Sequence, residues 1–391
     1  MVPQPTIPEV AAKLGRHGIS VSFLSPTATA LSKSIIDAVG PFRAYLKQQG
    51  FHDYERQEQG AIRRVDAYFV YPASTVRTTA SLYRPVTKDG DPRIWFYDLP
   101  SYAVAGDLLA VLSRGGALYV VNASKEGLLG TISQPGSPLA ELATKSTVLS
   151  ENAHELVDKL KYVGRQGFLP SLRTGPTGIG FTLETHLGIA ANVDRTPDYK
   201  GIELKASRVG GGPPNRVNLF SQVPDWRSSA LRNGRAILNE YGYVRDGRLQ
   251  LYCTVDHKPN PQGLFFDISS EDHLHSKARM DDGRVVDVVC WKADKLVDRL
   301  LEKHPETMWV KARAKRAGSG SEEFHFVKAV YTRNPFASSL LTLIGEGIVT
   351  MDYTLSLKPG GTTRDHGYLF KISPDLITAL FPPPLEFDLA A

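Results

Sequence analysis

The sequence contains little cysteine and no long apolar run. Only two cysteines, Cys253 and Cys290, occur among the 391 residues, which excludes a disulfide scaffold and a multi-cysteine zinc site. Both lie in apolar, strand-like runs, so we expect buried free thiols, which suit a reducing cytoplasm. No segment approaches the ~20 consecutive apolar residues that span a bilayer, and the N-terminus lacks the regions of a signal peptide. We therefore expect a cytoplasmic chain with no membrane span.

The charge balance is only slightly basic. The 46 Lys and Arg residues exceed the 41 Asp and Glu residues, which gives a formal net charge of +5. This balance fits a polyanionic partner, but an ordinary globular enzyme could carry the same charge. Hydrophobic residues make up 42% of the chain and charged residues 22%, which is typical of globular proteins, and the length allows two domains.

Secondary-structure patterns divide the chain into two parts. Short β-branched and aromatic runs predict a β-rich N-terminal domain over residues 1–135. Residues 130–138 are rich in Gly, Pro and Ser and are the best candidate for a linker. Residues 150–391 mix helix and strand patterns, so we predict an α/β (α+β) fold with a second domain in this range.

The sequence also predicts two helices. The first covers residues 33–49, with Gly40-Pro41 breaking or kinking it. The second covers residues 226–241, with Asp225 as its N-cap. Residues 308–316 and 323–331 predict a hairpin.

The most informative stretch is Asp198-Tyr199-Lys200-Gly201-Ile202-Glu203-Leu204-Lys205. Residues 202–207 read as a strand that points Glu203 and Lys205 to the same face, and Asp198 arrives from the preceding turn. Two carboxylates and an ammonium group can hold Mg²⁺, which prefers hard oxygen ligands, and can position an attacking water. An edge strand with a solvated, salt-bridged face has the same pattern, so this alternative stays open.

A helix pattern precedes this cluster. Residues 177–188 read as a glycine-rich turn that leads into a short helix, with Gly188 as a C-cap. Glu184 lies on this helix, close enough along the chain to Asp198 to reach the same site. We therefore include Glu184 among the candidate acids.

These segments resemble the MvaI/BcnI restriction endonucleases and their MutH relatives. The resemblance covers about residues 170–382 and rests on four ordered matches: residues 177–184, 197–205, 218–224 and 364–372. It implies a restriction-endonuclease-like catalytic domain with a central mixed sheet. The implied activity is Mg²⁺-dependent, sequence-specific cleavage of double-stranded DNA. A cognate DNA methyltransferase as partner and a monomeric state also fit the resemblance.

The resemblance also assigns roles to the candidate residues. Asp198, Glu203 and Lys205 would form the active-site triad, with Asp198 and Glu203 as metal ligands. Glu184 would be a supporting acid.

Four basic residues are candidate contacts to DNA phosphates. Lys311, Arg313 and Lys315 alternate with apolar residues, so on a strand they would form a basic row. The alternative is an ordinary solvated strand face. Arg208 directly follows the active-site strand.

Candidate contacts to bases lie in two predicted loops. Arg364, Asp365 and His366 follow a glycine-rich segment, and the resemblance suggests that this loop between strands reads bases. Arg can bond to guanine and Asp can accept from cytosine. The alternative is that Arg364 and Asp365 pair with each other. His257 and Lys258, in another loop, are weaker candidates.

The N-terminal part is loosely similar to the effector domain of EcoRII-type restriction enzymes. The similarity rests on residues 93–97, 105–109 and 118–122. It implies a second DNA-binding surface that reads another copy of the site. A module that binds a protein or only supports the fold is the alternative.

Two further functions stay open for the whole chain. One is a MutH-like DNA nickase that acts with repair partners. The other is a non-catalytic DNA-binding or sensor protein that has kept the fold. Both acids and the lysine are present, which argues against the non-catalytic alternative.

Overall fold

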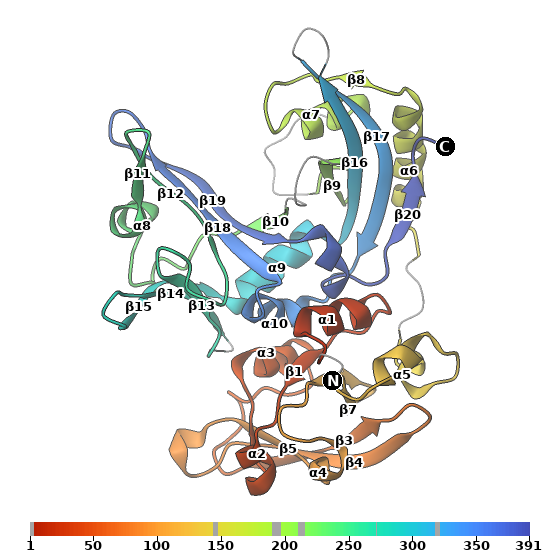
Figure 1. Cartoon of the computed structure of the whole chain (residues 1–391), viewed down its shortest axis with the longest axis vertical. Helices are drawn as coiled ribbons and strands as arrows, with labels where there is room; N and C mark the ends of the chain where they lie inside the picture. Colours follow the sequence, from red (N-terminus) through yellow and green to blue (C-terminus); the bar gives the residue numbers. More distant parts are fainter. Residues whose placement is uncertain (1–3, 144–147, 190–196, 210–215, 271, 317–320) are drawn as a thin grey trace.

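The computed structural model describes residues 4–143, 148–189, 197–209, 216–270, 272–316 and 321–391. Within these ranges the strands form four sheets, with helices packed against them (Figure 1). This mixed architecture confirms the predicted fold class. The helices in the described ranges are all too short or too polar to cross a membrane. Cys253 and Cys290 are both free thiols, and Cys290 is fully buried.

A seven-stranded sheet makes the N-terminal part β-rich, as predicted. In spatial order its strands are β1 (Ser22–Leu24), β6 (Leu109–Arg114), β7 (Ala117–Asn122), β3 (Ile62–Val70), β4 (Thr75–Tyr83), β5 (Arg93–Phe96) and β2 (Ile36–Asp37). Strands β3 and β7 are parallel, and the other pairs are antiparallel. The helical segments here are α1 (Ile7–Gly15), α2 (Ala28–Lys33), α3 (Gly40–Gln48), η1 (Lys88–Gly90), α4 (Leu99–Tyr102), η2 (Leu128–Ser133) and α5 (Pro138–Glu141).

Three predictions for helices and connections need correction. The helix predicted at residues 33–49 is α3 alone, because Pro41 occupies the first turn, where its missing N–H is tolerated, and so starts the helix. The helix predicted at 226–241 is α8 (Gly234–Tyr241), which is capped by the Asn233 side chain rather than by Asp225. The expected linker contains η2 and the start of α5, and its Ile132 is buried. The division into residues 1–135 and 150–391 stays a prediction.

The second sheet carries the acidic cluster. Its strands run in the order β20 (Leu385–Asp388), β17 (Glu322–Arg333), β16 (Glu306–Arg316) and β9 (Ile202–Val209), and β8 (Leu169–Pro170) pairs with β17. The predicted hairpin is β16 and β17, and its turn, residues 317–320, lies outside the described residues. Helices α6 (Glu151–Arg165) and α7 (Gly178–His186) pack on one face, where Leu156 and Leu160 are fully buried. Strand β9 is parallel to β16 and forms one edge of the sheet.

Two antiparallel sheets complete the C-terminal part. One has the order β10 (Val217–Ser221), β19 (Thr363–Ile372), β18 (Val349–Leu357), β12 (Arg248–Val255) and β11 (Tyr243–Arg245). The other consists of β13 (Leu264–Asp267), β14 (His273–Arg279) and β15 (Val285–Lys292). The remaining helical segments are α9 (Ala293–Lys303), η3 (Ala337–Ser339), α10 (Leu340–Gly345) and η4 (Pro374–Ala379).

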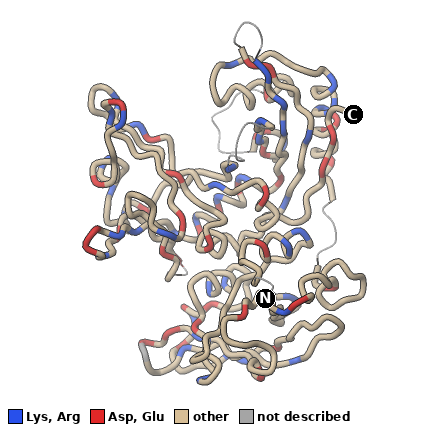
Figure 2. Tube along the Cα trace, viewed as in Figure 1, with Lys and Arg blue, Asp and Glu red and all other residues tan. Residues whose placement is uncertain are grey.

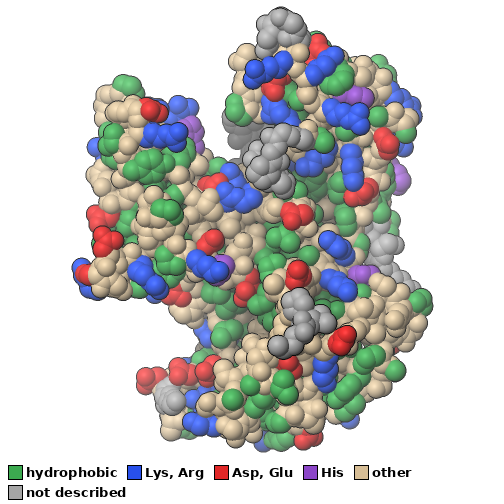
Figure 3. All heavy atoms as spheres, in the orientation of Figure 1, with side chains coloured by type: hydrophobic (Ala, Val, Ile, Leu, Met, Phe, Trp, Pro, Cys, Tyr) green, Lys and Arg blue, Asp and Glu red, His purple; other side chains and the backbone are tan. Residues whose placement is uncertain are grey.

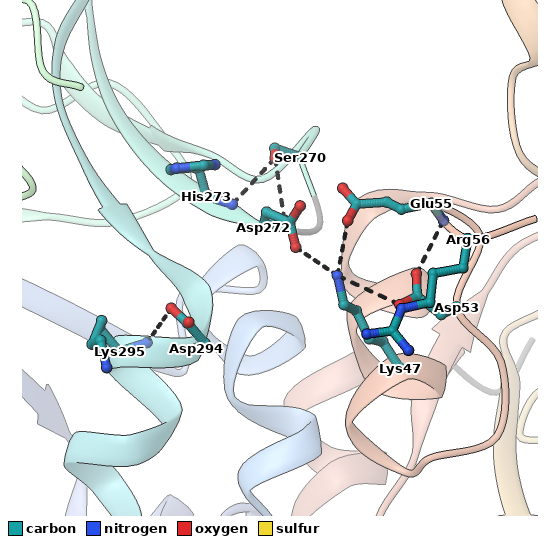
Figure 4. A network of polar contacts seen from close by, with 9 residues as sticks. All are labelled: Lys47, Asp53, Glu55, Arg56, Ser270, Asp272, His273, Asp294 and Lys295. Atoms are coloured by element: carbon teal, nitrogen blue, oxygen red, sulfur yellow. Dashed lines mark hydrogen bonds and ion pairs between the residues drawn. The ribbon is translucent and has the colours of Figure 1, made fainter.

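The N-terminal part packs directly on the C-terminal part. One apolar core contains side chains from both, among them Leu14 of α1 and Phe381. At its edge, the Lys47 amine of α3 lies 2.8 Å from an Asp272 carboxylate oxygen and 2.9 Å from one of Glu55 (Figure 4). The shared core, more than these exposed ion pairs, holds the two parts together, because exposed pairs contribute little.

Replacement of Gly15 by alanine is expected to destabilise this junction. A Cβ atom at Gly15 would lie 1.8 Å from the carbonyl oxygen of Thr378 in η4, so backbone would have to move. Overpacking of this kind costs about 1–3 kcal/mol of the free energy of unfolding, measurable by urea denaturation. The matched control is Gly130→Ala, whose Cβ would meet no atom within 4 Å. Equal stability of the two variants would contradict the packing described here.

Candidate active site

A tight turn places Asp198 beside the active-site strand. Lys200 and Gly201 both have positive φ, 45° and 90°, and the backbones of Tyr199 and Ile202 exchange hydrogen bonds of 2.9 and 2.7 Å. Two central residues with positive φ define a type I′ turn, in which glycine is favoured. The turn folds Asp198 back, so that its Oδ2 accepts a hydrogen bond of 2.9 Å from the backbone N–H of Leu204.

Glu203 is buried between two lysines. Its side chain is 2% exposed, its Oε1 lies 2.5 Å from the Nζ of Lys205, and its Oε2 lies 3.4 Å from the Nζ of Lys303. The predicted neighbourhood of Glu203 and Lys205 on one face of β9 is therefore present in the structure. The solvated, salt-bridged edge strand does not describe this site, because an almost fully buried carboxylate is not a solvated one.

The acids lie close enough for neighbouring charge to raise the pKa of Asp198 and of Glu184. Burial raises the pKa of Asp198, and the charge of Glu203 raises it further. Burial likewise raises the pKa of Glu184 on α7, with the charge of Asp198 as the next cause. The structure thus brings Glu184, Asp198, Glu203 and Lys205 into one electrostatic neighbourhood, and their roles in catalysis stay predictions.

Lys303 is the residue that sequence reasoning missed. It is the last residue of α9 and lies 98 positions after Lys205, in a segment with no motif of its own. The parallel pairing of β16 with β9 sets Thr307 opposite Glu203, and this brings the end of α9 to the acid. Only this strand register indicates that Lys303 lies near Glu203, and the sequence does not reveal the register.

His304 lies next to this site but has no free nitrogen. It is fully buried, its Nδ1 lies 2.8 Å from the Thr307 hydroxyl, and its Nε2 lies 2.7 Å from the carbonyl oxygen of Leu219. Burial, with the charge of Lys205 as a lesser cause, lowers the pKa of His304 to about 3. A neutral, doubly hydrogen-bonded imidazole is structural, and it fixes the chain beside Lys303.

The donor set of this site fits a hard divalent cation. Asp198 and Glu203 offer carboxylate oxygens, which Mg²⁺ prefers, and crowding of the acids means that a cation would relieve their repulsion. In the described part of the chain, no three His, Cys, Asp or Glu side chains converge on one point. The cation would therefore need further oxygen ligands from substrate or water.

The predicted phosphate contacts differ in accessibility. Arg313 and Lys315 are exposed on β16, and Lys315 lies 3.0 Å from Glu323. Lys311 is half-buried and donates a hydrogen bond of 2.8 Å to the Ser207 hydroxyl. Arg208 lies 2.6 Å from Glu322, and both basic and acidic residues occur on β16 and β17 (Figure 2). The row is therefore partly neutralised within the protein.

The predicted base contacts lie on a strand and on a separate turn. The predicted loop at residues 358–361 lies between β18 and β19, and Arg364, Asp365 and His366 follow it as exposed residues of β19, where Arg364 and Asp365 pair with β18. Asp365 accepts a hydrogen bond of 2.7 Å from the N–H of Gly367. His257 and Lys258 follow β12 at the opposite end of this sheet, so the structure does not bring the two groups together.

An open notch separates the two groups of sheets. Figure 3 shows it between the part that carries β16 and β17 and the part that carries β18 and β19. Strand β9, the edge strand with the acids, lies on the side of its sheet that faces this notch (Figure 1). The candidate acids and the candidate base contacts therefore belong to parts that flank the same opening.

Comparison with known proteins supports the resemblance seen in the sequence. The model of the MvaI/BcnI restriction endonuclease family matches residues 157–381. Restriction endonuclease MvaI in complex with its cognate DNA is similar in fold, with a TM-score of 0.52 and 21% identity over 62% of this chain and 100% of that chain. MvaI without DNA gives a TM-score of 0.37 at 21% identity, over 62% of this chain and 99% of that chain. Among curated proteins none matches.

Proposed function

Because this chain belongs to the MvaI/BcnI restriction endonuclease family, we propose that it hydrolyses both strands of double-stranded DNA at a specific sequence with Mg²⁺ as cofactor. The observation that carries the proposal is the arrangement on β9, where a buried glutamate, a folded-back aspartate and a lysine share one site. DNA would enter the notch between the two groups of sheets.

Each residue of the site has a distinct task in this proposal. Asp198 and Glu203 would hold the cation together with a phosphate oxygen, and Glu184 would support them from α7. When bound, Mg²⁺ would lower the pKa of a water molecule and neutralise charge on the phosphate. Lys205, held by Glu203 at 2.5 Å, would position the attacking water and stabilise the negative charge that develops on the phosphate oxygens.

Incubation with plasmid DNA tests the proposal and its nearest alternative. Purified protein with Mg²⁺ is expected to convert supercoiled plasmid to linear fragments, and sequencing of the ends gives the site. Open circles that never become linear would favour the MutH-like nickase. No change with any plasmid or divalent ion would favour the non-catalytic alternative.

Replacement of Arg364 by alanine is expected to weaken discrimination between sequences. A side chain that bonds a base edge contributes about 1–3 kcal/mol of discrimination, and Arg364 is exposed on β19. The measurement is cleavage of the cognate site and of single-base variants. Arg245→Ala, on β11 at the edge of the same sheet, is the control. Equal discrimination between sequences by both variants would show that Arg364 does not contact the bases.

The N-terminal sheet is proposed as a second DNA-binding module. Its residues precede the family match, which begins at residue 157, so its role rests on the resemblance to an EcoRII-type effector domain alone. Plasmids that carry two copies of the site should then be cut faster than plasmids that carry one. Equal rates would favour a protein-binding or purely structural module. A partner methyltransferase and a monomeric state stay predictions.

A further inference from the structure

Glu203 has one cationic partner more than the predicted triad supplies. Lys205 contacts Oε1 and Lys303 contacts Oε2, at 2.5 and 3.4 Å, so an ammonium group faces each carboxylate oxygen. The Lys303 side chain is only 17% exposed and Glu203 only 2%. An ion pair this buried is held by the surrounding structure, unlike an exposed pair between mobile side chains.

The fold fixes Lys303 at this position through its neighbours. Helix α9 ends at Lys303, and the next residue, His304, is locked by hydrogen bonds to Thr307 and to the carbonyl of Leu219. Thr307 is the register partner of Glu203 in the parallel pair of β16 and β9. A short connection, in which His304 is hydrogen-bonded, therefore joins the helix that carries the second lysine to β16, and β16 pairs with the strand that carries the acid.

The formal charges of the site favour one divalent cation. With Glu184, Asp198 and Glu203 ionised, three negative charges face the three positive charges of Lys205, Lys303 and Arg173, which leaves a net charge of zero. One divalent cation and one phosphodiester of charge −1 bring the sum to +1. A second divalent cation would raise the sum to +3, close to an ammonium group that is only 17% exposed.

We propose that Lys303 is a positioning residue that holds the Oε2 atom of Glu203 and fills the side of this carboxylate where a second divalent cation would bind. The site then takes one divalent ion per chain. This inference rests on the proposed function of the same site. Lys303 acts through Glu203, whereas Lys205 acts on the water and the phosphate.

Counting bound Mn²⁺ without DNA tests the inference independently of cleavage. The full-length chain, Lys303→Met, Lys303→Arg and Lys295→Met are titrated with Mn²⁺, and free Mn²⁺ is measured by electron paramagnetic resonance. Lys295 is the matched control because it lies on the same helix and is 62% exposed. The wild type, Lys303→Arg and Lys295→Met are expected to bind one ion with similar affinity. Lys303→Met is expected to bind a second ion, or the first about tenfold or more tightly, because a repelling charge is lost.

A merely structural role for Lys303 would give a different result. Loss of packing would weaken Mn²⁺ binding and cleavage together, whereas the proposal expects binding to tighten while kcat falls and KM for DNA changes little. Unchanged or weaker Mn²⁺ binding by Lys303→Met, or two ions in the wild type, would overturn the inference. If Lys303→Met does not fold, Lys303→Gln and the stoichiometry of the wild type still decide the question.

The same experiments separate this inference from the proposed function. If the wild type cleaves DNA but binds two Mn²⁺ ions, or binds no Mn²⁺ in the absence of DNA, the inference about Lys303 is wrong and the proposed function stands. A wild type that neither binds Mn²⁺ nor cleaves any plasmid removes the proposed function as well.

Discussion

Replacement of Lys205 by alanine is expected to slow DNA cleavage at least about a thousandfold, because it removes the charge that stabilises the transition state of phosphate attack. DNA binding should stay within a few-fold of the wild type, since the Lys205 side chain is only 28% exposed and offers little surface for contact with DNA. The measurement is single-turnover cleavage of a duplex with the cognate site, beside a binding assay in Ca²⁺. Asp198→Ala should give the same separation of binding from cleavage.

The neighbouring lysine provides the control. Lys200 lies in the turn before β9 and pairs with Glu155 at 2.5 Å, away from Glu203. Lys200→Ala should therefore cleave at nearly the wild-type rate. Full cleavage by Lys205→Ala at ordinary Mg²⁺ concentrations would refute the assignment of the active site.

Neutral replacements of the two acids are expected to change stability in opposite directions, although both should abolish cleavage. Glu203→Gln leaves Lys205 and Lys303 without their shared counter-charge. Breaking a buried pair costs about 3–5 kcal/mol; we expect about 2–3 kcal/mol here, because the Lys205 side chain keeps some contact with solvent. Asp198→Asn should instead stabilise the metal-free protein, with Tm higher by roughly a few degrees.

The expected stabilisation by Asp198→Asn follows from the raised pKa of Asp198. Its folded-state pKa lies above the ordinary value of 3.8, through burial first and the charge of Glu203 second. The stabilising contribution of the protonated carboxyl is complete below pH 3.8 and is lost as pH rises through the folded-state pKa. At neutral pH the ionised group therefore destabilises the metal-free protein, and asparagine removes this cost.

Thermal unfolding at neutral pH in EDTA, and again in Mg²⁺, measures both effects. Mg²⁺ should raise the Tm of the wild type and leave that of Asp198→Asn nearly unchanged, because an ion stabilises only the state that binds it. A lower Tm for Asp198→Asn than for the wild type in EDTA would contradict the crowding of the acids.

The active-site motif was predictable because its chemistry is local. The turn at Lys200 and Gly201 and the alternation along β9 both act within eight residues, from Asp198 to Lys205. Glu184 could be included among the candidate acids because it lies on a short helix that precedes this turn closely in the sequence. The starts of the two predicted helices were misplaced because α3 begins at the proline in its first turn and α8 begins at the Asn233 cap, and periodicity alone does not locate a helix start.

The structure of the segment with the candidate base contacts, residues 364–366, could not be predicted from local sequence. The glycine-rich segment 358–361 forms the predicted loop, but residues 364–366, which were expected to act as part of it, belong to β19, where Arg364 and Asp365 pair with β18. Pairing with the adjacent strand can extend a strand beyond a turn-forming segment, because the sheet supplies hydrogen bonds that a loop lacks.

By itself the sequence predicted the mixed fold class and, at the start of β9, the two acids and the lysine that we propose for metal-assisted hydrolysis, since side-chain alternation and turn geometry are properties of adjacent residues. Tertiary structure alone decided that Glu203 is buried, that Lys303 faces it from a distant helix, and that Arg208 and Lys315 already have acidic partners. These facts depend on the parallel register of β9 with β16 and on the pairing of β16 with β17. The register of β9 with β16 joins segments about a hundred residues apart, and the apolar packing that fixes it has no local sequence signature. The pairing of β16 with β17 is the hairpin that the sequence predicted.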